Sequence, residues 1–375
     1  MDDYAIVIGL QNYPGIGEPA LSGPENDAVK FKEWILSETG GNLAAANVIT
    51  ILSSDYPVNG DSFLNAKPAF NDVFVAFANL RSIHDKNIKS GNGPKVGRRL
   101  YIFMSGHGIA PVPYGNKIQK ESALLMADVD PTNAGAWQYH FPGVYAASWF
   151  ADNECFDEVF LFMDCCRDIT IVPSSNIFFP PKGNADNAIR FYAFATKWSS
   201  RAREKPMKDA AGNISIRGIF TVTLLLGLSG AAAEPDPANP TQGIITVASL
   251  KSYLYQNMKG FIAPEFLTAD VQEPDVDYSP KANDGRDIVI KTSVLQTFPF
   301  MIRVPAGATG SISIMYNGMV AVAQLQVNSA PAELPVNLAR GKYLAIVAIN
   351  GTTRSKIFDV TGTEDTGKEG VVDFN

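Results

Sequence analysis

Residues 99–108 read RLYIFMSGHG, and residues 159–167 read VFLFMDCCR. Each stretch opens with a continuous apolar run, which predicts a strand buried on both faces of a parallel sheet. Each run ends at reactive side chains: His107 between two glycines in one stretch, and Cys165 and Cys166 in the other. Reactive groups in an open parallel sheet collect at the carboxyl ends of the strands. If the two strands are neighbours, His107 and Cys166 lie side by side although they are 59 positions apart in the chain.

The chain up to about residue 293 alternates apolar strands with amphipathic helices, which predicts an α/β fold with a mostly parallel sheet flanked by helices. Further strands are expected at Tyr4–Leu10, Val48–Leu52, Phe191–Thr196 and Asp287–Ile290, with helices at about 26–37, 66–83, 145–153, 218–228 and 247–258. From about residue 296 the pattern changes to short strands of period two, which predicts a small antiparallel β-sandwich. We therefore expect domains at residues 1–293 and 294–375.

Composition limits the classes of function. The 375-residue chain carries a net charge of −7, whereas nucleic acids and anionic membranes attract clustered positive charge, so neither is an expected partner. No apolar run reaches the ~18 residues of a membrane span, and the acidic N-terminus does not resemble a signal peptide. The three cysteines, two of them adjacent, are not a disulfide framework, which favours a reducing cytoplasm.

The two strand ends carry the parts of a thiol nucleophile. A cysteine attacks a carbonyl as a thiolate, and a nearby imidazole can take its proton. Gly108 has no side chain to block its backbone N–H, so the N–H groups of Gly108 and Cys166 are expected to donate to a substrate oxyanion. Taken singly, a histidine after a strand or a buried cysteine is more often structural; matching strand-end positions reverse that preference.

Four motifs occur in a set order: LSGPENDA at 21–28, SGHG at 105–108, DCCR at 164–167 and GIFT at 218–221. This set resembles the caspase and metacaspase clan of cysteine peptidases over about residues 4–292. The resemblance implies a caspase-like fold with a six-stranded sheet and a Cys–His dyad that needs no third acid. It implies that Cys166 is the nucleophile, His107 the general acid/base and Cys165 a buried packing residue, with Cys165 as nucleophile the rival assignment.

The resemblance also implies a specificity pocket. Its matching positions are Asp27, Ser105 and Asp164, the residue types of the metacaspase-like branch. Two carboxylates favour a guanidinium or ammonium group, so we expect a cysteine endopeptidase that cleaves protein or peptide substrates after Arg or Lys. Asp27 could also cap a helix, and Asp164 could be only a turn residue.

Two loops offer basic residues for activating self-cleavage or cleavage by another protease: residues 169–188, which include Lys182, and residues 197–213. Both could equally be ordinary solvated loops. No cofactor is expected, and the spacing of Cys and His predicts no metal site. Some members of the clan need calcium, for which the candidate ligands are Asp128, Asp130, Asp152 and Asp157, but no dense acidic run supports it.

Two other functions fit the same fold. The first is a catalytically silent interaction or scaffold module, against which the intact dyad and pocket residues argue. The second is another thiol enzyme, such as an acyltransferase that uses the same dyad. The β-rich tail is expected to serve in recognition or docking.

Overall fold

The structure is a computed structural model of the chain. It describes residues 2–16, 21–57, 62–113, 121–133, 136–172, 179, 188–208, 212–261, 272–279, 289–316, 320–328, 333–360 and 370–374. The chain divides into two compact units: Met1–Leu225 with Met258–Arg286, and Leu226–Asn257 with Asp287–Asn375. Residues 226–257, which the sequence pattern assigned to the first domain, group with the β-rich second unit. The domain boundary at 293/294 itself stays a prediction.

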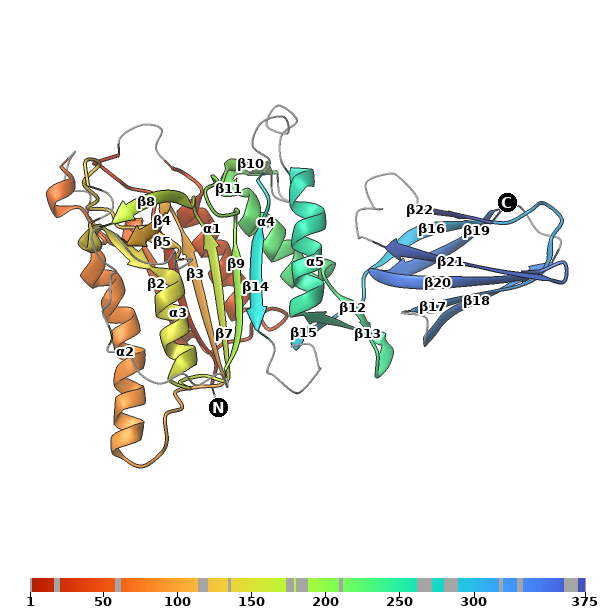
Figure 1. The fold of residues 1–375 in the computed structure, drawn as a ribbon, viewed down its shortest axis with the longest axis horizontal. Helices are drawn as coiled ribbons and strands as arrows, with labels where there is room; N and C mark the ends of the chain where they lie inside the picture. Colours follow the sequence, from red (N-terminus) through yellow and green to blue (C-terminus); the bar gives the residue numbers. More distant parts are fainter. Residues whose placement is uncertain are drawn as a thin grey trace. The chain divides into compact units, whose positions relative to one another are not determined.

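A six-stranded sheet forms the centre of the first unit (Figure 1). Its order is β2-β1-β3-β7-β9-β14, and every neighbouring pair is parallel except β9 and β14. The strands are β1 (Tyr4–Gly9), β2 (Val48–Leu52), β3 (Arg99–Ser105), β7 (Glu158–Asp164), β9 (Ile189–Phe194) and β14 (Asp275–Ser279). The predicted α/β fold with a mostly parallel six-stranded sheet is therefore confirmed.

The identity of the last strand corrects one expectation. The sequence pattern suggested Asp287–Ile290, but the sixth strand is β14, and β15 (Val289–Ser293) pairs instead with β13 (Asn239–Thr246). β14 alternates polar and apolar residues, and Val276 is its one fully buried apolar side chain. An edge strand of this kind lacks the continuous apolar run that marks the buried strands.

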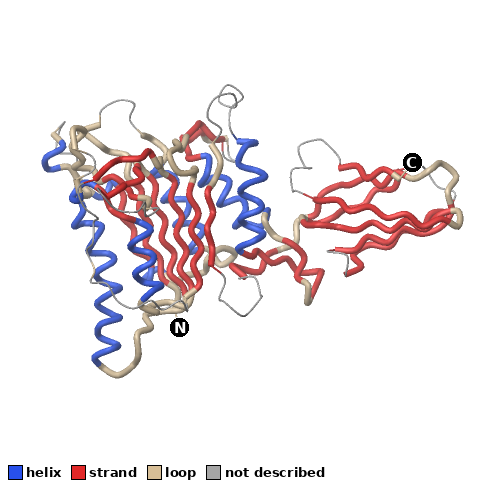
Figure 2. Tube along the Cα trace, viewed as in Figure 1, coloured by secondary structure: helices blue, strands red, loops and turns tan. Residues whose placement is uncertain are grey.

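Helices cover both faces of the sheet, as the blue coils beside the red strands in Figure 2 show. On one face, Phe31 of α1 (Pro24–Leu36) stacks on Phe103 of β3 with ring centroids 4.6 Å apart, and lies 5.6 Å from Phe162 of β7. On the other face, α2 (Phe70–Lys89) and α3 (Gly143–Asp152) bury Phe77 and Phe150 against the alternate residues of the same strands. Each buried phenylalanine contributes roughly 1.5–3 kcal/mol to folding.

Two smaller β elements stand at the carboxyl ends of β3 and β7. A second sheet has the order β6-β5-β4-β8, and β10 and β11 form a two-stranded antiparallel sheet, which α4 follows in the chain. Their bounds are β4 (Gly108–Pro113), β5 (Ala123–Leu125), β6 (His140–Pro142), β8 (Asp168–Val172), β10 (Glu204–Lys208), β11 (Ile214–Gly218) and α4 (Ile219–Leu226). The chain therefore passes from β3 to β4, and from β7 to β8, with only a few residues between them.

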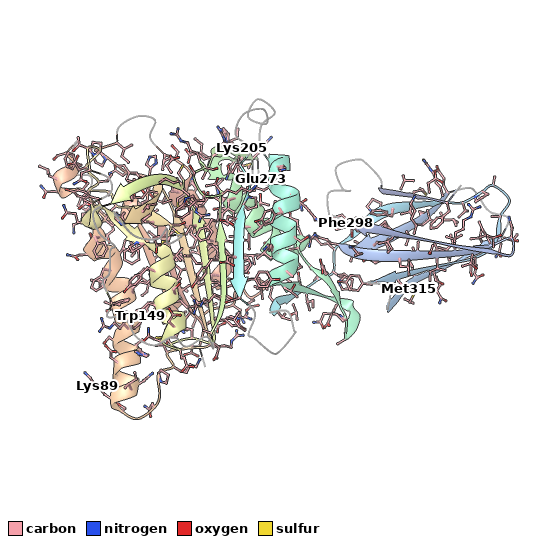
Figure 3. The ribbon with its side chains drawn as sticks, in the orientation of Figure 1. Lys89, Trp149, Lys205, Glu273, Phe298 and Met315 are labelled. Atoms are coloured by element: carbon pink, nitrogen blue, oxygen red, sulfur yellow. The ribbon has the colours of Figure 1, made fainter. Side chains whose placement is uncertain are left out.

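The second unit contains a three-stranded sheet, the helix α5 (Val247–Asn257) and the predicted β-sandwich. The two sheets of the sandwich are β19-β16-β22 and β18-β17-β20-β21. Phe298 on β16 and Met315 on β17 are labelled in Figure 3. The pair β16 and β22 is parallel, so the sandwich is not wholly antiparallel as predicted. The strands are β12 (Glu234–Asp236), β16 (Thr297–Arg303), β17 (Thr309–Tyr316), β18 (Val320–Asn328), β19 (Glu333–Ala339), β20 (Gly341–Ile349), β21 (Thr352–Val360) and β22 (Gly370–Asp373).

Short helical turns complete the described elements: η1 (Ala45–Asn47), η2 (Ser53–Asp55), η3 (Phe63–Asn65), η4 (Trp137–Tyr139), η5 (Gly227–Ala231) and η6 (Met258–Phe261). Of the helices that the structure describes, none combines the length and the apolar character needed to cross a bilayer.

Candidate active site

His107 and Cys166 occupy the same level of two adjacent strand pairs. Below them, Ser105 pairs with Asp164 in the ladder between β3 and β7. Above them, Ile109 pairs with Asp168 in the ladder between β4 and β8. The residues in each of these pairs are as far apart in sequence as His107 and Cys166 are. The register is therefore the same in both ladders, and neither chain segment has an extra residue between them. The backbones of β3–β4 and β7–β8 therefore carry the two reactive residues side by side.

The predicted site residues meet at one cavity of about 470 Å³. Its wall includes the reactive pair, Gly108 and all three predicted pocket residues, Asp27, Ser105 and Asp164. Ser105 is the last residue of β3 and is buried. Further lining residues are Arg201, Ala202 and Arg203 from the segment that leads into β10, and Glu204, the first residue of β10.

The Cys166 thiol is half-buried and donates a weak hydrogen bond to the carbonyl of Ala202, with 3.8 Å between sulfur and oxygen. Burial raises the pKa of Cys166, so the free thiol is protonated at neutral pH. Cys165 is 2% exposed, and burial raises its pKa as well. A methyl group on Gly108 would come 2.5 Å from the Cys165 sulfur, which puts Cys165 beneath the β4 backbone, in a packing position.

The His107 imidazole is mostly buried, and burial lowers its pKa. A neutral imidazole at neutral pH can accept a proton from a thiol. The His107 backbone is fixed from two sides: its N–H donates to the Tyr13 hydroxyl at 3.1 Å, and its carbonyl accepts from the N–H of Leu125 at 2.8 Å. The rings of Tyr13 and His107 meet edge to face, with centroids 4.8 Å apart.

Gly106 makes the close approach of Tyr13 possible. Its φ of +155° lies in a region that favours glycine, and a methyl group there would come 2.4 Å from the Tyr13 hydroxyl. Sequence reasoning missed Tyr13, whose only local signal is its place in the loop after the first strand.

The two pocket carboxylates are buried and converge on Gly218. A methyl group on Gly218 would come 2.1 Å from Asp164 Oδ2 and 2.8 Å from Asp27 Oδ2. Burial raises the pKa of both carboxyl groups, that of Asp164 to about 6, while the Arg217 guanidinium and the Gly218 N–H act in the opposite direction on Asp27. The Thr221 N–H and hydroxyl donate to Asp164 Oδ2 at 3.0 and 2.6 Å. These bonds and the charge of Arg217 act in the opposite direction on the pKa of Asp164.

Asp27 is not a helix cap, which corrects one alternative. Helix α1 begins at Pro24 after Gly23, so Asp27 lies inside its first turn. Its carboxylate instead accepts from Arg217 Nε at 2.5 Å and from the Gly218 N–H at 2.7 Å. Arg217 immediately precedes the GIFT motif in sequence, but nothing in the chain order indicated that it pairs with an acid of the pocket.

Arg167, the residue after Cys166, is 1% exposed and connects the end of β7 to the neighbouring strands. Its guanidinium donates to the Thr196 carbonyl at 3.1 Å and to Asp275 of β14 at 2.7 Å. It also stacks over the Phe194 ring, with its central carbon 4.2 Å from the ring centroid. The buried cation therefore helps to hold both the turn after Cys166 and the edge strand.

The calcium candidates do not form a cluster among the described residues, within which no group of three or more His, Cys, Asp or Glu is arranged to hold a metal ion. Asp152 is paired with Arg190 and Asp157 with Lys95. Asp130 accepts from Thr132, and the buried Oδ1 of Asp128 has no hydrogen-bond partner in the described part of the chain.

The two predicted regulatory loops are described only in part. Most of residues 169–188, including Lys182, lies outside the described residues. Of residues 197–213, the structure describes 197–208 and 212–213, and this stretch supplies Arg201, Ala202 and Arg203 to the cavity wall. Lys205, labelled in Figure 3, follows on β10.

No protein-family model matches the chain. Over 240 residues, or 61% of its length, the chain is 29% identical to a curated relative named as a probable protease of a Desulfuromonadales bacterium. The chain spans about a quarter of the length of that relative, 26%. The solved structures that it resembles include a Geobacter sulfurreducens protein, with a TM-score of 0.42 and 14% identity over 75% of this chain and 96% of that one. They also include caspase-1 from Spodoptera frugiperda, with a TM-score of 0.41 and 11% identity over 78% of this chain and 90% of that one.

The strand order and the two motif-bearing strand ends define the class of the first unit. It is an α/β unit with a mostly parallel six-stranded sheet, in which the segments that follow the central strands β3 and β7 bring a histidine and a cysteine to one edge of the sheet. The sequence motifs implied this class, and the topology agrees with it.

Proposed function

We propose that the chain is a cysteine endopeptidase that cleaves proteins after Arg or Lys through a Cys166–His107 dyad and an acyl-enzyme. The observation that carries the proposal is the cavity shared by His107, Cys166 and the two carboxylates Asp27 and Asp164. The relative named as a probable protease supports a peptidase activity. Protein or peptide substrates with a basic residue before the scissile bond follow from the charge of the pocket.

In the first step, neutral His107 takes the proton of the Cys166 thiol as the sulfur attacks the scissile carbonyl carbon. The carbonyl π electrons move to oxygen, which becomes an oxyanion. Collapse of this intermediate breaks the C–N bond, and the His107 imidazolium gives its proton to the departing amine. A water molecule then attacks the thioester with His107 as base, releasing the acid and restoring the thiol. General acid–base catalysis of this kind contributes about 10²–10⁴-fold in rate.

The backbone around Gly108 suits oxyanion binding. N–H groups along a strand point alternately to its two sides, and the His107 N–H points toward β5, where the Tyr13 hydroxyl accepts it. The Gly108 N–H then points to the other side, toward the turn that carries Cys166. Together with the Cys166 N–H it can donate to the oxyanion, and one such donor is worth about 10²–10³-fold in kcat.

The basic specificity rests on two buried acids. A guanidinium or ammonium group placed in the cavity can donate a charge-assisted hydrogen bond to a carboxylate that is itself largely buried. An aspartate side chain in the same position would meet like charge. We therefore expect a strong preference for Arg and Lys over Asp.

The test is a panel of fluorogenic peptides that differ only in Arg, Lys or Asp before the scissile bond, measured with and without calcium. The wild-type chain should cleave the Arg and Lys peptides, and Cys166→Ala should not. Cys165→Ala is the matched control and should stay active. Activity that survives in Cys166→Ala would refute the nucleophile, and a preference for Asp would refute the pocket.

Activation by cleavage in residues 197–213 is part of the proposal. The Ala202 carbonyl lies against the Cys166 thiol, and the side chain of the neighbouring Arg201 is 73% exposed, so a basic site lies next to the nucleophile. The mass of the purified chain tests this: wild type should be cut after Arg201 or Arg203, and Cys166→Ala should remain whole unless another protease is added.

A further inference from the structure

The two acids of the pocket differ in their partners. Both oxygens of Asp27 accept hydrogen bonds, Oδ1 from the Arg217 guanidinium at 2.5 Å and Oδ2 from the Gly218 N–H at 2.7 Å. Among the described residues, the Asp164 side chain accepts only through Oδ2, and both of its donors belong to the neutral residue Thr221. The protein therefore supplies a full positive charge to one carboxylate of the pocket and none directly to the other.

Arg217 approaches Asp27 from behind the pocket. It is 9% exposed, and it is not one of the described residues that line the cavity, whereas Asp27 is. Its Nη2 is buried and has no hydrogen-bond partner within the described ranges. A buried guanidinium with an unmatched N–H is costly unless a nearby anion balances its charge, and Asp27 is that anion.

We propose that Arg217 is the built-in counter-ion of the specificity pocket, so that the charge which binds a basic substrate side chain is that of Asp164. This inference rests on the proposed function and refines it. A guanidinium and a backbone N–H that donate to its two oxygens favour the ionised form of Asp27. Ionised Asp27 and Arg217 together are neutral, which leaves the pocket with one net negative charge from Asp164. Without a counter-ion, two buried carboxylates that converge on Gly218 would repel each other, and one of them would take up a proton.

Asp27 then acts on specificity through Arg217. In Asp27→Asn, the Arg217 guanidinium loses its partner and competes with the substrate cation for Asp164. Removing both charges, in Asp27→Asn with Arg217→Gln, returns the pocket to one negative charge. If Asp27 instead held the substrate directly, the second substitution would restore nothing.

The experiment is a double-mutant cycle measured as kcat/KM on two peptides, one with Arg and one with its neutral isostere citrulline before the scissile bond. For Asp27→Asn we expect the Arg/citrulline ratio to fall roughly 100-fold, the scale of a buried charge left unpaired. The double variant should recover at least about tenfold of that loss. If Asp27 and Arg217 served only to stabilise the fold, the substitutions would lower kcat/KM equally for both peptides and leave the ratio unchanged.

The matched control is the partly buried pair Arg99–Glu158, at the amino ends of β3 and β7, away from the cavity. The cycle of Arg99→Gln and Glu158→Gln should change the melting temperature but leave the Arg/citrulline ratio unchanged. A ratio that fell in this cycle as well would show that the effect is one of stability and would overturn the role of Arg217.

A binding arm separates this inference from the proposed function. In the Cys166→Ala background, calorimetry with benzamidinium and with neutral benzamide reports the charge of the pocket without catalysis. Benzamidinium should bind to Cys166→Ala, and its affinity should fall when Asp27→Asn is added to that background. The affinity should recover when Arg217→Gln is added as well. If wild type cleaves no basic peptide yet this pattern holds, the peptidase proposal fails and the counter-ion stands. Absence of binding, or of recovery, overturns the counter-ion itself.

Discussion

The Tyr13 hydroxyl is inserted between the backbone N–H of His107 and the carbonyl of Leu125, at 3.1 and 3.2 Å. The Leu125 N–H still donates to the His107 carbonyl at 2.8 Å, so the phenol replaces one of the two bonds that an antiparallel pair exchanges. The Tyr13 side chain, from the loop after β1, is thereby part of the ladder that holds His107. The position of His107 depends on a residue that performs no proton transfer in the proposed mechanism.

Tyr13→Phe should lower kcat about tenfold with little change in KM, because the two backbone groups of His107 and Leu125 lose their bridge. Unsatisfied buried groups of this kind cost about 1–3 kcal/mol each. The measurement is the pH profile of kcat/KM. Its acidic limb should move, because an imidazole displaced from its position has a different pKa. Tyr192→Phe is the control, since it removes a buried hydroxyl that bonds Ser148 outside the cavity. Equal pH profiles for Tyr13→Phe and wild type would contradict the positioning role.

The acidic limb of the wild-type profile should lie below the pKa of 6.5 of an ordinary histidine, because burial lowers the pKa of His107. The catalytic form of the histidine is neutral in the free enzyme, so activity persists as the pH falls until the imidazole is protonated.

The rate at which iodoacetamide alkylates Cys166 should keep rising at pH values where the rate for an ordinary thiol has levelled off, since burial raises the pKa of Cys166. A pH-independent alkylation rate between pH 6 and about 9 would contradict a protonated resting thiol.

Asp164→Asn should remove cleavage after Arg and Lys while making the fold more stable at neutral pH. The pKa of Asp164 is raised from 3.8 to about 6, so the folded state holds this proton more tightly than the unfolded state. The stability from that proton is fully present below pH 3.8 and is lost as the pH rises through about 6. Asparagine keeps an acceptor for Thr221 and carries no buried charge.

Urea unfolding at two pH values tests this expectation. At pH 7 the Asn variant should gain up to about 3 kcal/mol over wild type, and near pH 4 the difference should be close to zero. Asp157→Asn, at an exposed pair with Lys95, is the control and should show no such dependence. A gain of the same size at both pH values would argue against a raised pKa.

Gly108→Ala should destabilise the fold by about 2 kcal/mol or more and should reduce activity strongly. The added methyl group would come 2.5 Å from the Cys165 sulfur and 2.7 Å from the Cys166 carbonyl oxygen, and core overpacking costs typically 1–3 kcal/mol. Gly260→Ala is the matched control because no atom lies within 4 Å of its added methyl group. Thermal unfolding and peptide cleavage should both separate the two variants. Wild-type behaviour of Gly108→Ala would show that the β4 backbone can move away from Cys165.

The sheet and the meeting of His107 with Cys166 could be predicted from the chain because their signals are local. Continuous apolar runs such as those of β3 and β7 are satisfied only inside a covered parallel sheet. Glycines beside a histidine, and an aspartate before two cysteines, mark where each run ends. The edge strand β14 lacks such a local signal, because Val276 is its one buried apolar residue and it has no apolar run. For this reason the sequence did not predict it.

The sequence by itself determined which reactive groups stand at the strand ends and how many acids the motifs contain. Only the tertiary structure decided the net charge of the pocket and the hydrogen bonds that hold the His107 backbone. Arg217 lies 190 positions from Asp27, and His107 lies 94 positions from Tyr13. Electrostatic interactions depend on distance and burial, and neither quantity can be read from chain order until the fold brings those residues together.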